Sequence, residues 1–119
     1  MNKIIEKLVD GLKIGPDVYM DVEIRNETVG DMVAALSDAE KLVTTPDGYE
    51  LVSNPAMVGL LSLGRQIVRI GDLAGPIDID NLKKLSTIDL EIIRGAADGL
   101  TEASLKKVKN RGRPSASSE

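Results

Sequence analysis

The chain lacks several of the side chains on which enzyme and metal sites depend. It has no cysteine, histidine, phenylalanine or tryptophan, and Tyr19 and Tyr49 are its only aromatic residues. These absences exclude disulfides, cysteine nucleophiles, histidine bases and zinc sites of the usual kinds. With so few rings, we do not expect a site that stacks bases or sugars. The core must be built from leucine, isoleucine, valine, methionine and alanine.

Long apolar segments are also missing. No stretch approaches the roughly 20 apolar residues that span a bilayer, and the first ten residues are too charged for a secretory signal peptide. We therefore expect a soluble protein of a reducing compartment with no membrane partner. The 119 residues are enough for one domain with one modest core.

Charge is unevenly distributed along the chain. Residues 1–103 contain 10 lysine or arginine and 18 aspartate or glutamate residues, a formal charge of −8. Residues 104–119 contain five basic and one acidic residue, a formal +4. We expect a single α+β domain over residues 1–109 and a disordered basic, serine-rich tail over residues 110–119.

Apolar periodicity predicts an N-terminal β-hairpin followed by a helix. Apolar and polar residues alternate over residues 18–25, which is typical of a strand with one buried face. Residues 12–14 and the turn at 15–17 supply the other side of the hairpin, whereas residues 2–9 fit either a short helix or a first strand. Thr28 has capping-box spacing to Asp31 and begins a helix that runs to about Leu42. In that helix, the predicted apolar stripe contains Val29, Met32, Val33, Ala35, Leu36 and Ala39, with Asp31, Asp38 and Glu40 facing water.

The rest of the chain is predicted to be mainly helical, with a small inserted hairpin over residues 42–52. Asn54 and Pro55 begin a helix that runs to about Ile70, and a loop over residues 71–76 follows. Asp78 caps a short helix over residues 79–85. Ser86, with Asp89 three residues later, opens a helix that ends near Gly99, and a last turn or two continues to about Lys109.

The helix over residues 55–70 is apolar on more than one side. Such a helix is either central to the fold or partly used to bind an apolar helix of another protein. The candidate protein-binding residues are Leu60, Leu63, Ile67 and Ile70.

Two other groups of residues could form a metal site or a DNA-binding motif, but neither is strongly indicated. Asp72, Asp78 and Asp80 could hold a divalent cation, but their spacing is not that of an EF-hand loop, and cap positions explain them. Arg111-Gly112-Arg113-Pro114 matches the core of an AT-hook, which inserts arginine into a narrow minor groove. The acidic body argues against nucleic acid as a partner. No nucleophile–base pair is present, so we expect no enzyme activity and no cofactor or metal.

The order of these signals resembles the Mu-like phage tail assembly chaperone family. The segment VEIRNETVGDM resembles the opening of that family, a strand and an arginine followed by Thr-Val-Gly-Asp and an apolar helix. The segment IVRIGDLAGPIDIDNLKKLSTIDLEIIRGAADGL resembles its second half, with Leu82, Leu85, Ser86 and Asp89 at the matching places. The resemblance covers roughly residues 12–36 and 56–100. Glu27 replaces a frequent proline, and the hairpin at Pro46-Asp47-Gly48 is an insertion.

This resemblance implies an assembly factor that acts in the host cytoplasm. Such proteins bind and solubilise the tape measure protein while the tail tube protein polymerises around it, and they are often made in two lengths by a translational frameshift. The chain would be the shorter form, with its longer form and a homo-oligomer as further partners. Two alternatives stay open, namely a small DNA-associated accessory protein that uses the tail motif and a structural tail subunit.

Overall fold

The fold is built on a four-stranded antiparallel sheet. The computed structural model describes residues 2–52 and 54–112. β1 (Lys3–Ile14) and β2 (Asp17–Arg25) form the N-terminal hairpin, so residues 2–9 belong to a strand. β5 (Ile67–Ile70) and β6 (Leu73–Ala74) extend the sheet in the order β1-β2-β5-β6. The predicted α+β class and its N-terminal hairpin are confirmed.

A bulge interrupts the pairing of β1 with β2 within the hairpin. The register between β1 and β2 shifts between Lys7 and Leu12, and Gly11 adopts a φ of 83° within this interval. A Cβ at Gly11 would lie 2.6 Å from the Met20 sulfur and 2.9 Å from the Tyr19 carbonyl oxygen. Glycine is therefore required at this position by both its backbone angle and its close neighbours.

The helix that begins at Pro55 ends four residues before its predicted end at Ile70, so this prediction is wrong. α2 (Pro55–Gln66) ends where Ile67 becomes extended. The next four residues form β5, which pairs with β2 through Ile70 opposite Val22 and Arg69 opposite Glu23. Three of these four residues are β-branched and fit a pleated sheet well. Pairing with β2 outweighs the continued helical pattern, and β6 lies within the segment predicted to be a loop.

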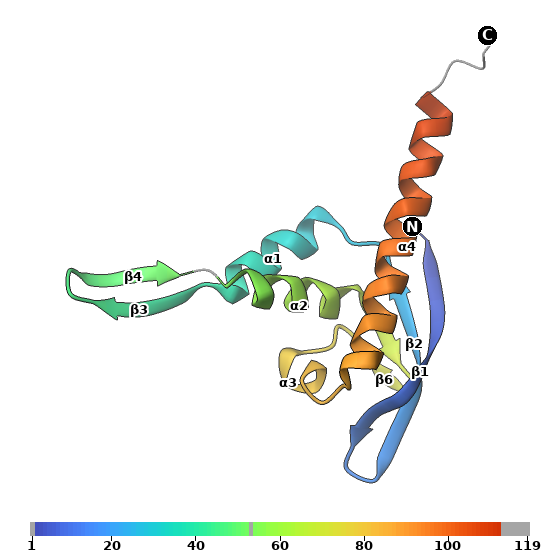
Figure 1. Ribbon diagram of the computed structural model, residues 1–119, viewed down its shortest axis with the longest axis horizontal. Coiled ribbons are helices and arrows are strands. Elements are labelled where there is room, and N and C mark those ends of the chain that lie inside the picture. The colour runs from blue at the N-terminus through green and yellow to red at the C-terminus, as the bar shows by residue number, and fades with distance from the viewer. Residues whose placement is uncertain (1, 53, 113–119) are drawn as a thin grey trace.

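The first helix is also shorter than predicted. α1 (Val29–Ala39) ends before Glu40, which has extended angles, and it does not reach Leu42. The predicted small hairpin follows directly as β3 (Lys41–Thr45) and β4 (Gly48–Val52). This two-stranded sheet extends from the body at the left of Figure 1.

The C-terminal helices differ from their predicted bounds. α3 (Ile79–Leu82) has the predicted cap, because the Asp78 carboxylate accepts a hydrogen bond from the Asn81 amide at 3.0 Å, but it stops three residues early. α4 (Thr87–Gly112) is continuous through Gly99 and enters the predicted tail by three residues. Residues 113–119 lie outside the described residues, so the disordered tail stays a prediction there.

The core lies between the sheet, α2, α3 and the first half of α4. In Figure 1, α4 crosses the sheet and then continues beyond it. The two projections, α4 and the β3–β4 hairpin, explain principal extents of 62, 46 and 21 Å. The buried apolar cluster consists of Leu8, Leu12, Val22, Ile24, Leu63, Ile67, Ile70, Ile77, Leu82, Ile93, Ala96, Ala97 and Leu100.

Candidate partner-binding face

α1 packs on the body with its small residues and leaves its large apolar residues exposed. Asp31, Ala35 and Ala39, spaced four apart on one side of the helix, are buried at 2%, 0% and 0% exposure. The packing partner of α1 is α2. The prediction that Asp31 faces water is therefore wrong, and the predicted apolar stripe is divided between two faces.

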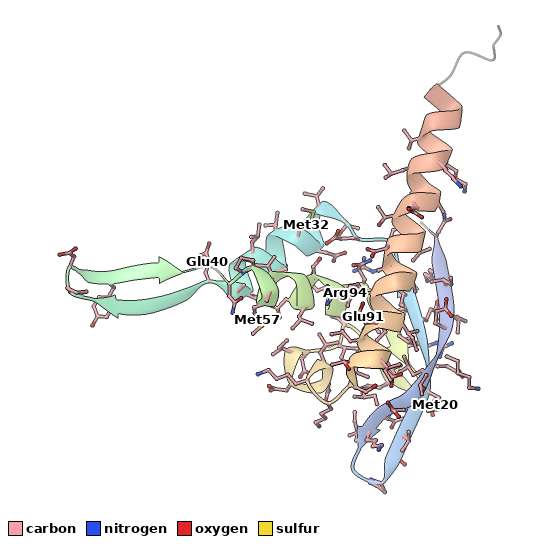
Figure 2. The ribbon with its side chains drawn as sticks, viewed as in Figure 1. Met20, Met32, Glu40, Met57, Glu91 and Arg94 are labelled. Atoms are coloured by element: carbon pink, nitrogen blue, oxygen red, sulfur yellow. The ribbon has the colours of Figure 1, made fainter. Side chains whose placement is uncertain are left out.

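The large residues of that stripe form a continuous row on the outside of α1. Val29, Met32, Val33 and Leu36 follow the spacing of one helix face. Their exposed fractions are 75%, 48%, 60% and 47%. Figure 2 shows Met32 on the side of α1 that points away from α2. We call these four residues the α1 face. An exposed apolar row of this kind is typical of a site that binds another protein.

An ionic cluster centred on Asp31 fixes the orientation of α1. The Arg25 guanidinium donates to both Asp31 carboxylate oxygens, at 2.7 and 3.0 Å, and Arg65 Nε donates to one of them at 3.3 Å. The Asp31 carboxylate also accepts from the Thr28 amide at 2.9 Å, while the Thr28 hydroxyl accepts from the Asp31 amide. The predicted capping box is thus confirmed, and the same carboxylate joins β2 and α2 to α1.

The same contacts set the charge of the cluster. The hydrogen bonds from Arg25 hold the pKa of Asp31 far below its usual value, although burial of the carboxylate acts in the opposite direction. The amide and hydroxyl of Thr28 also lower this pKa. Asp31 therefore stays ionised at any physiological pH. Its ion pairs with Arg25 and Arg65 determine which side of α1 faces the body.

Acidic groups are the only charges on the segment that carries the α1 face. Residues 27–40 contain four acidic residues and no lysine or arginine. Asp31 is engaged by the arginines, and Glu27 accepts a hydrogen bond from the Ser62 hydroxyl. Asp38 and Glu40 are exposed near the C-terminal end of α1. The α1 face is therefore an apolar row beside negative charge.

Most of the residues predicted to bind a partner lie in the interior. Leu63, Ile67 and Ile70 have exposed fractions of 6%, 1% and 0%, and they belong to the buried cluster. Leu60 is half-buried and lines a small cavity of about 180 Å³ with apolar residues of α3 and α4. The apolar excess predicted for residues 55–70 is therefore largely used in the core, through Leu63 of α2 and through Ile67 and Ile70 of β5. Partner binding by these four residues stays a prediction, for which Leu60 alone offers an accessible side chain.

The remaining candidates from the sequence are the acidic residues near Asp78 and the AT-hook motif of the tail. Asp78 is a helix cap, and the described residues contain no group of three or more acidic, histidine or cysteine side chains able to hold a metal ion. None of the helices in residues 2–52 and 54–112 is long and apolar enough to cross a membrane. Arg111 and Gly112 end α4, whereas Arg113 and Pro114 lie outside the described residues, so the DNA-binding alternative remains untested.

Asp89 has a role that its sequence position did not reveal. The Ser86 hydroxyl accepts from the Asp89 amide at 3.1 Å, as the predicted helix start requires. The Asp89 carboxylate, however, is fully buried and accepts from the backbone amides of Val9, Asp10 and Gly11 at 2.6, 3.1 and 2.8 Å. It attaches the start of α4 to the bulge of β1. Each of the two segments that resemble the chaperone family thus contains one buried carboxylate that joins elements distant in the chain.

Comparison with known proteins gives one family. The family described as tail assembly protein gp41 matches residues 8–113. The Mu-like prophage FluMu protein gp41 of Haemophilus influenzae is 38% identical over 107 residues, which cover 89% of this chain and 84% of that protein. The probable tail assembly protein gp41 of Escherichia phage Mu is 42% identical over 89 residues, or 71% of this chain and 62% of that protein.

A second phage Mu protein matches in the same way. The probable tail assembly protein FS-gp41 is also 42% identical over 89 residues, but these cover only 47% of its length. The chain therefore spans between about half and four-fifths of the length of these curated relatives. No solved structure matches the chain.

Proposed function

Because the chain belongs to the tail assembly protein gp41 family of Mu-like phages, we propose that it is a chaperone that binds and solubilises the tape measure protein during phage tail assembly. A general role in tail assembly follows from the family. Binding would occur in the host cytoplasm, before the tail tube protein has polymerised.

The observation that carries the proposal is the α1 face. A chaperone that keeps a long helical protein soluble must cover apolar helix surface, and it needs no catalytic group. The α1 face offers four exposed apolar residues over about two turns, which is the length that one amphipathic helix uses to bind another. Since Asp31 and its two arginines hold α1 in place, the α1 face is preorganised. Little conformational entropy is therefore lost when a partner binds to it.

Charge narrows the kind of helix that fits. A bound helix would place its flanking side chains next to Asp38 and Glu40, with no basic side chain on the same segment to oppose them. Lysine or arginine beside the apolar row of the tape measure helix would therefore be favoured over aspartate or glutamate.

We also propose that the chain is the shorter member of a pair of proteins that share one N-terminal part. The two phage Mu relatives match with equal identity over the same number of residues, yet the chain covers 62% of one and 47% of the other. The two relatives therefore share a region of similar sequence and differ in the number of residues outside it. A translational frameshift near the end of the gene would produce such a pair, and the longer form would bind alongside the shorter one.

Co-expression with the candidate tape measure protein tests the chaperone function. The wild-type chain should keep the tape measure protein in the soluble fraction and co-purify with it. The double variant Val33→Asp/Leu36→Asp places two carboxylates on the α1 face and should weaken the complex by at least about tenfold. Both residues are exposed, so the variant should keep the wild-type unfolding temperature.

The matched control changes two apolar residues of α4 that are at least about as exposed as the test pair. Ile88 and Leu105 are 58% and 62% exposed on α4, and Ile88→Asp/Leu105→Asp should leave the complex intact. A tape measure protein that stays insoluble with the wild-type chain would contradict the chaperone function. If both double variants lose binding to the tape measure protein equally, the α1 face is not the binding site. Stoichiometric amounts of this chain in purified virions would favour a structural subunit instead.

A further inference from the structure

The contacts of the β3–β4 hairpin are mainly those between its own two strands. Its strands pair with each other from Lys41 opposite Val52 to Thr45 opposite Gly48. Within residues 2–52 and 54–112, no other helix or strand packs extensively on either of them. The hairpin extends away from α1 and α2 in Figure 1, and Tyr49 near its turn is 75% exposed.

Such a hairpin is incomplete as a structural unit. An isolated two-stranded hairpin is marginally stable in water, and three or more strands are generally needed for independent stability. Each strand of a two-stranded sheet also has an outer edge, which is a template for another strand. The hairpin is therefore expected to gain most of its order from a strand of another chain.

The edge of β3 lacks the features that normally prevent pairing. In the four-stranded sheet, the edge strand β1 carries several charged residues and a bulge, and the opposite edge, β6, has only two residues. These are usual devices against edge-to-edge association. β3 has the sequence Lys-Leu-Val-Thr-Thr, with no proline, no register shift in its pairing and no charge after Lys41.

Charge selects which edge can pair with a second copy of this chain. If β3 pairs antiparallel with the same strand of another copy, Val43 lies opposite the partner's Val43 and Lys41 lies opposite the partner's Thr45. No like charges then face each other. The same arrangement for β4 would place Glu50 directly opposite the partner's Glu50, which is unfavourable.

We propose that β3 is a self-association edge, through which two copies of this chain form a two-fold symmetric sheet in the order β4-β3-β3-β4. An antiparallel pair of identical strands is a closed, isologous contact, so the assembly stops at two copies. The association needs no tape measure protein, and its failure would leave the proposed chaperone function untouched.

Charge reversal at the symmetry axis tests the proposal. Val43→Lys keeps the hairpin formed, because residue 43 pairs with Glu50 in the same chain. It places two lysines opposite each other in the dimer and should weaken self-association by about tenfold. The double variant Val43→Glu/Glu50→Lys also keeps an opposite-charge pair within the hairpin but brings two glutamates together. Val43→Thr, which adds no charge, is the control and should dimerise like the wild type.

Sedimentation velocity over a range of concentrations gives the readout. With rising concentration the wild type should shift from monomer to dimer, each charged variant alone should need about tenfold higher concentration to do so, and their equimolar mixture should dimerise like the wild type. Hydrogen exchange should show protection of residues 42–44 that increases with wild-type concentration. A monomeric wild type, charged variants that dimerise normally, or a mixture that stays monomeric would each overturn the proposal. A monomeric wild type whose tape measure complex is lost in V43K would assign the edge to that partner instead.

Discussion

The carboxylate of Asp89 accepts a hydrogen bond from the amide of Gly11 at 2.8 Å, across 78 positions of the chain. The contact joins the first turn of α4 to the bulge of β1, and the amides of Val9 and Asp10 point to the same carboxylate. These hydrogen bonds connect the N-terminal hairpin to the C-terminal helix, and the other contacts between the two elements are mainly apolar.

Asp89→Asn should destabilise the protein by about 2 to 3 kcal/mol. A carboxylate with two oxygens serves three amides, whereas an asparagine side chain has one oxygen and brings an amide group that cannot accept. Urea unfolding measures the change. Asp98→Asn, an exposed change on the same helix, is the control and should alter stability by less than about 0.5 kcal/mol. Equal stability of the two variants would contradict this role of Asp89.

Gly11→Ala should be strongly destabilising. The new Cβ would have to displace the Met20 sulfur and the Tyr19 carbonyl oxygen, and alanine disfavours a φ of 83°. Gly59→Ala is a matched control, because Gly59 lies within α2 with nothing within 4 Å of the added carbon. It should stabilise the helix by up to about 1 kcal/mol. Thermal unfolding of the two variants should therefore move in opposite directions.

The Asp31 cluster should make stability depend on pH at the acidic end. Because the folded state lowers the pKa of Asp31, the cluster contributes fully above the unfolded-state pKa, which is about 3.9. The contribution is lost as the pH falls below this value toward the folded-state pKa. Asp31→Asn lacks it at every pH and should cost about 3 kcal/mol near neutrality. Urea midpoints of the two proteins should converge between pH 4 and about pH 2, and a constant gap would contradict this account.

The orientation of α1 can be checked by adding volume to each of its faces. Ala35→Leu inserts a large side chain at a position that is fully buried, and overpacking of this kind costs about 1 to 3 kcal/mol. Val33→Leu makes a smaller addition at a position that is 60% exposed and should have little effect. Calorimetric melting temperatures measure both changes. If Val33→Leu were the more damaging, the outer row of α1 would be its packing face.

Local signals predicted the ends of elements where one side chain and its near neighbours decide the conformation. Thr28, Asn54 and Asp78 cap the helices that they were predicted to cap. The turns at Gly15 and Pro46 also connect the predicted hairpins. These interactions form within three or four residues, so their geometry can be inferred from spacing alone.

Prediction failed where a distant segment competes for the same residues. Ile67 continues a helical pattern, but β2 offers a strand edge with which residues 67–70 pair. The α1 stripe was recognised as apolar, but Asp31 was predicted to face water, and the division of the stripe between two faces was not predicted. Ala35 and Ala39 did contain a signal, because small residues four apart allow two helices to approach closely. The burial of Asp31, Ala35 and Ala39 depends on α2 and on Arg25.

The sequence by itself determined the class of this protein. The absence of cysteine and histidine argued against the usual enzyme and zinc sites, the apolar periodicity predicted an α+β fold, and the resemblance of two short segments pointed to a tail assembly protein. Only the tertiary structure decided which surfaces are available. It buried Leu63, Ile67 and Ile70, exposed the α1 face and, within the described residues, paired β3 with β4 alone. The physical reason is that caps and turns are governed by neighbours in the chain, whereas burial is a competition among all segments for the same limited contacts.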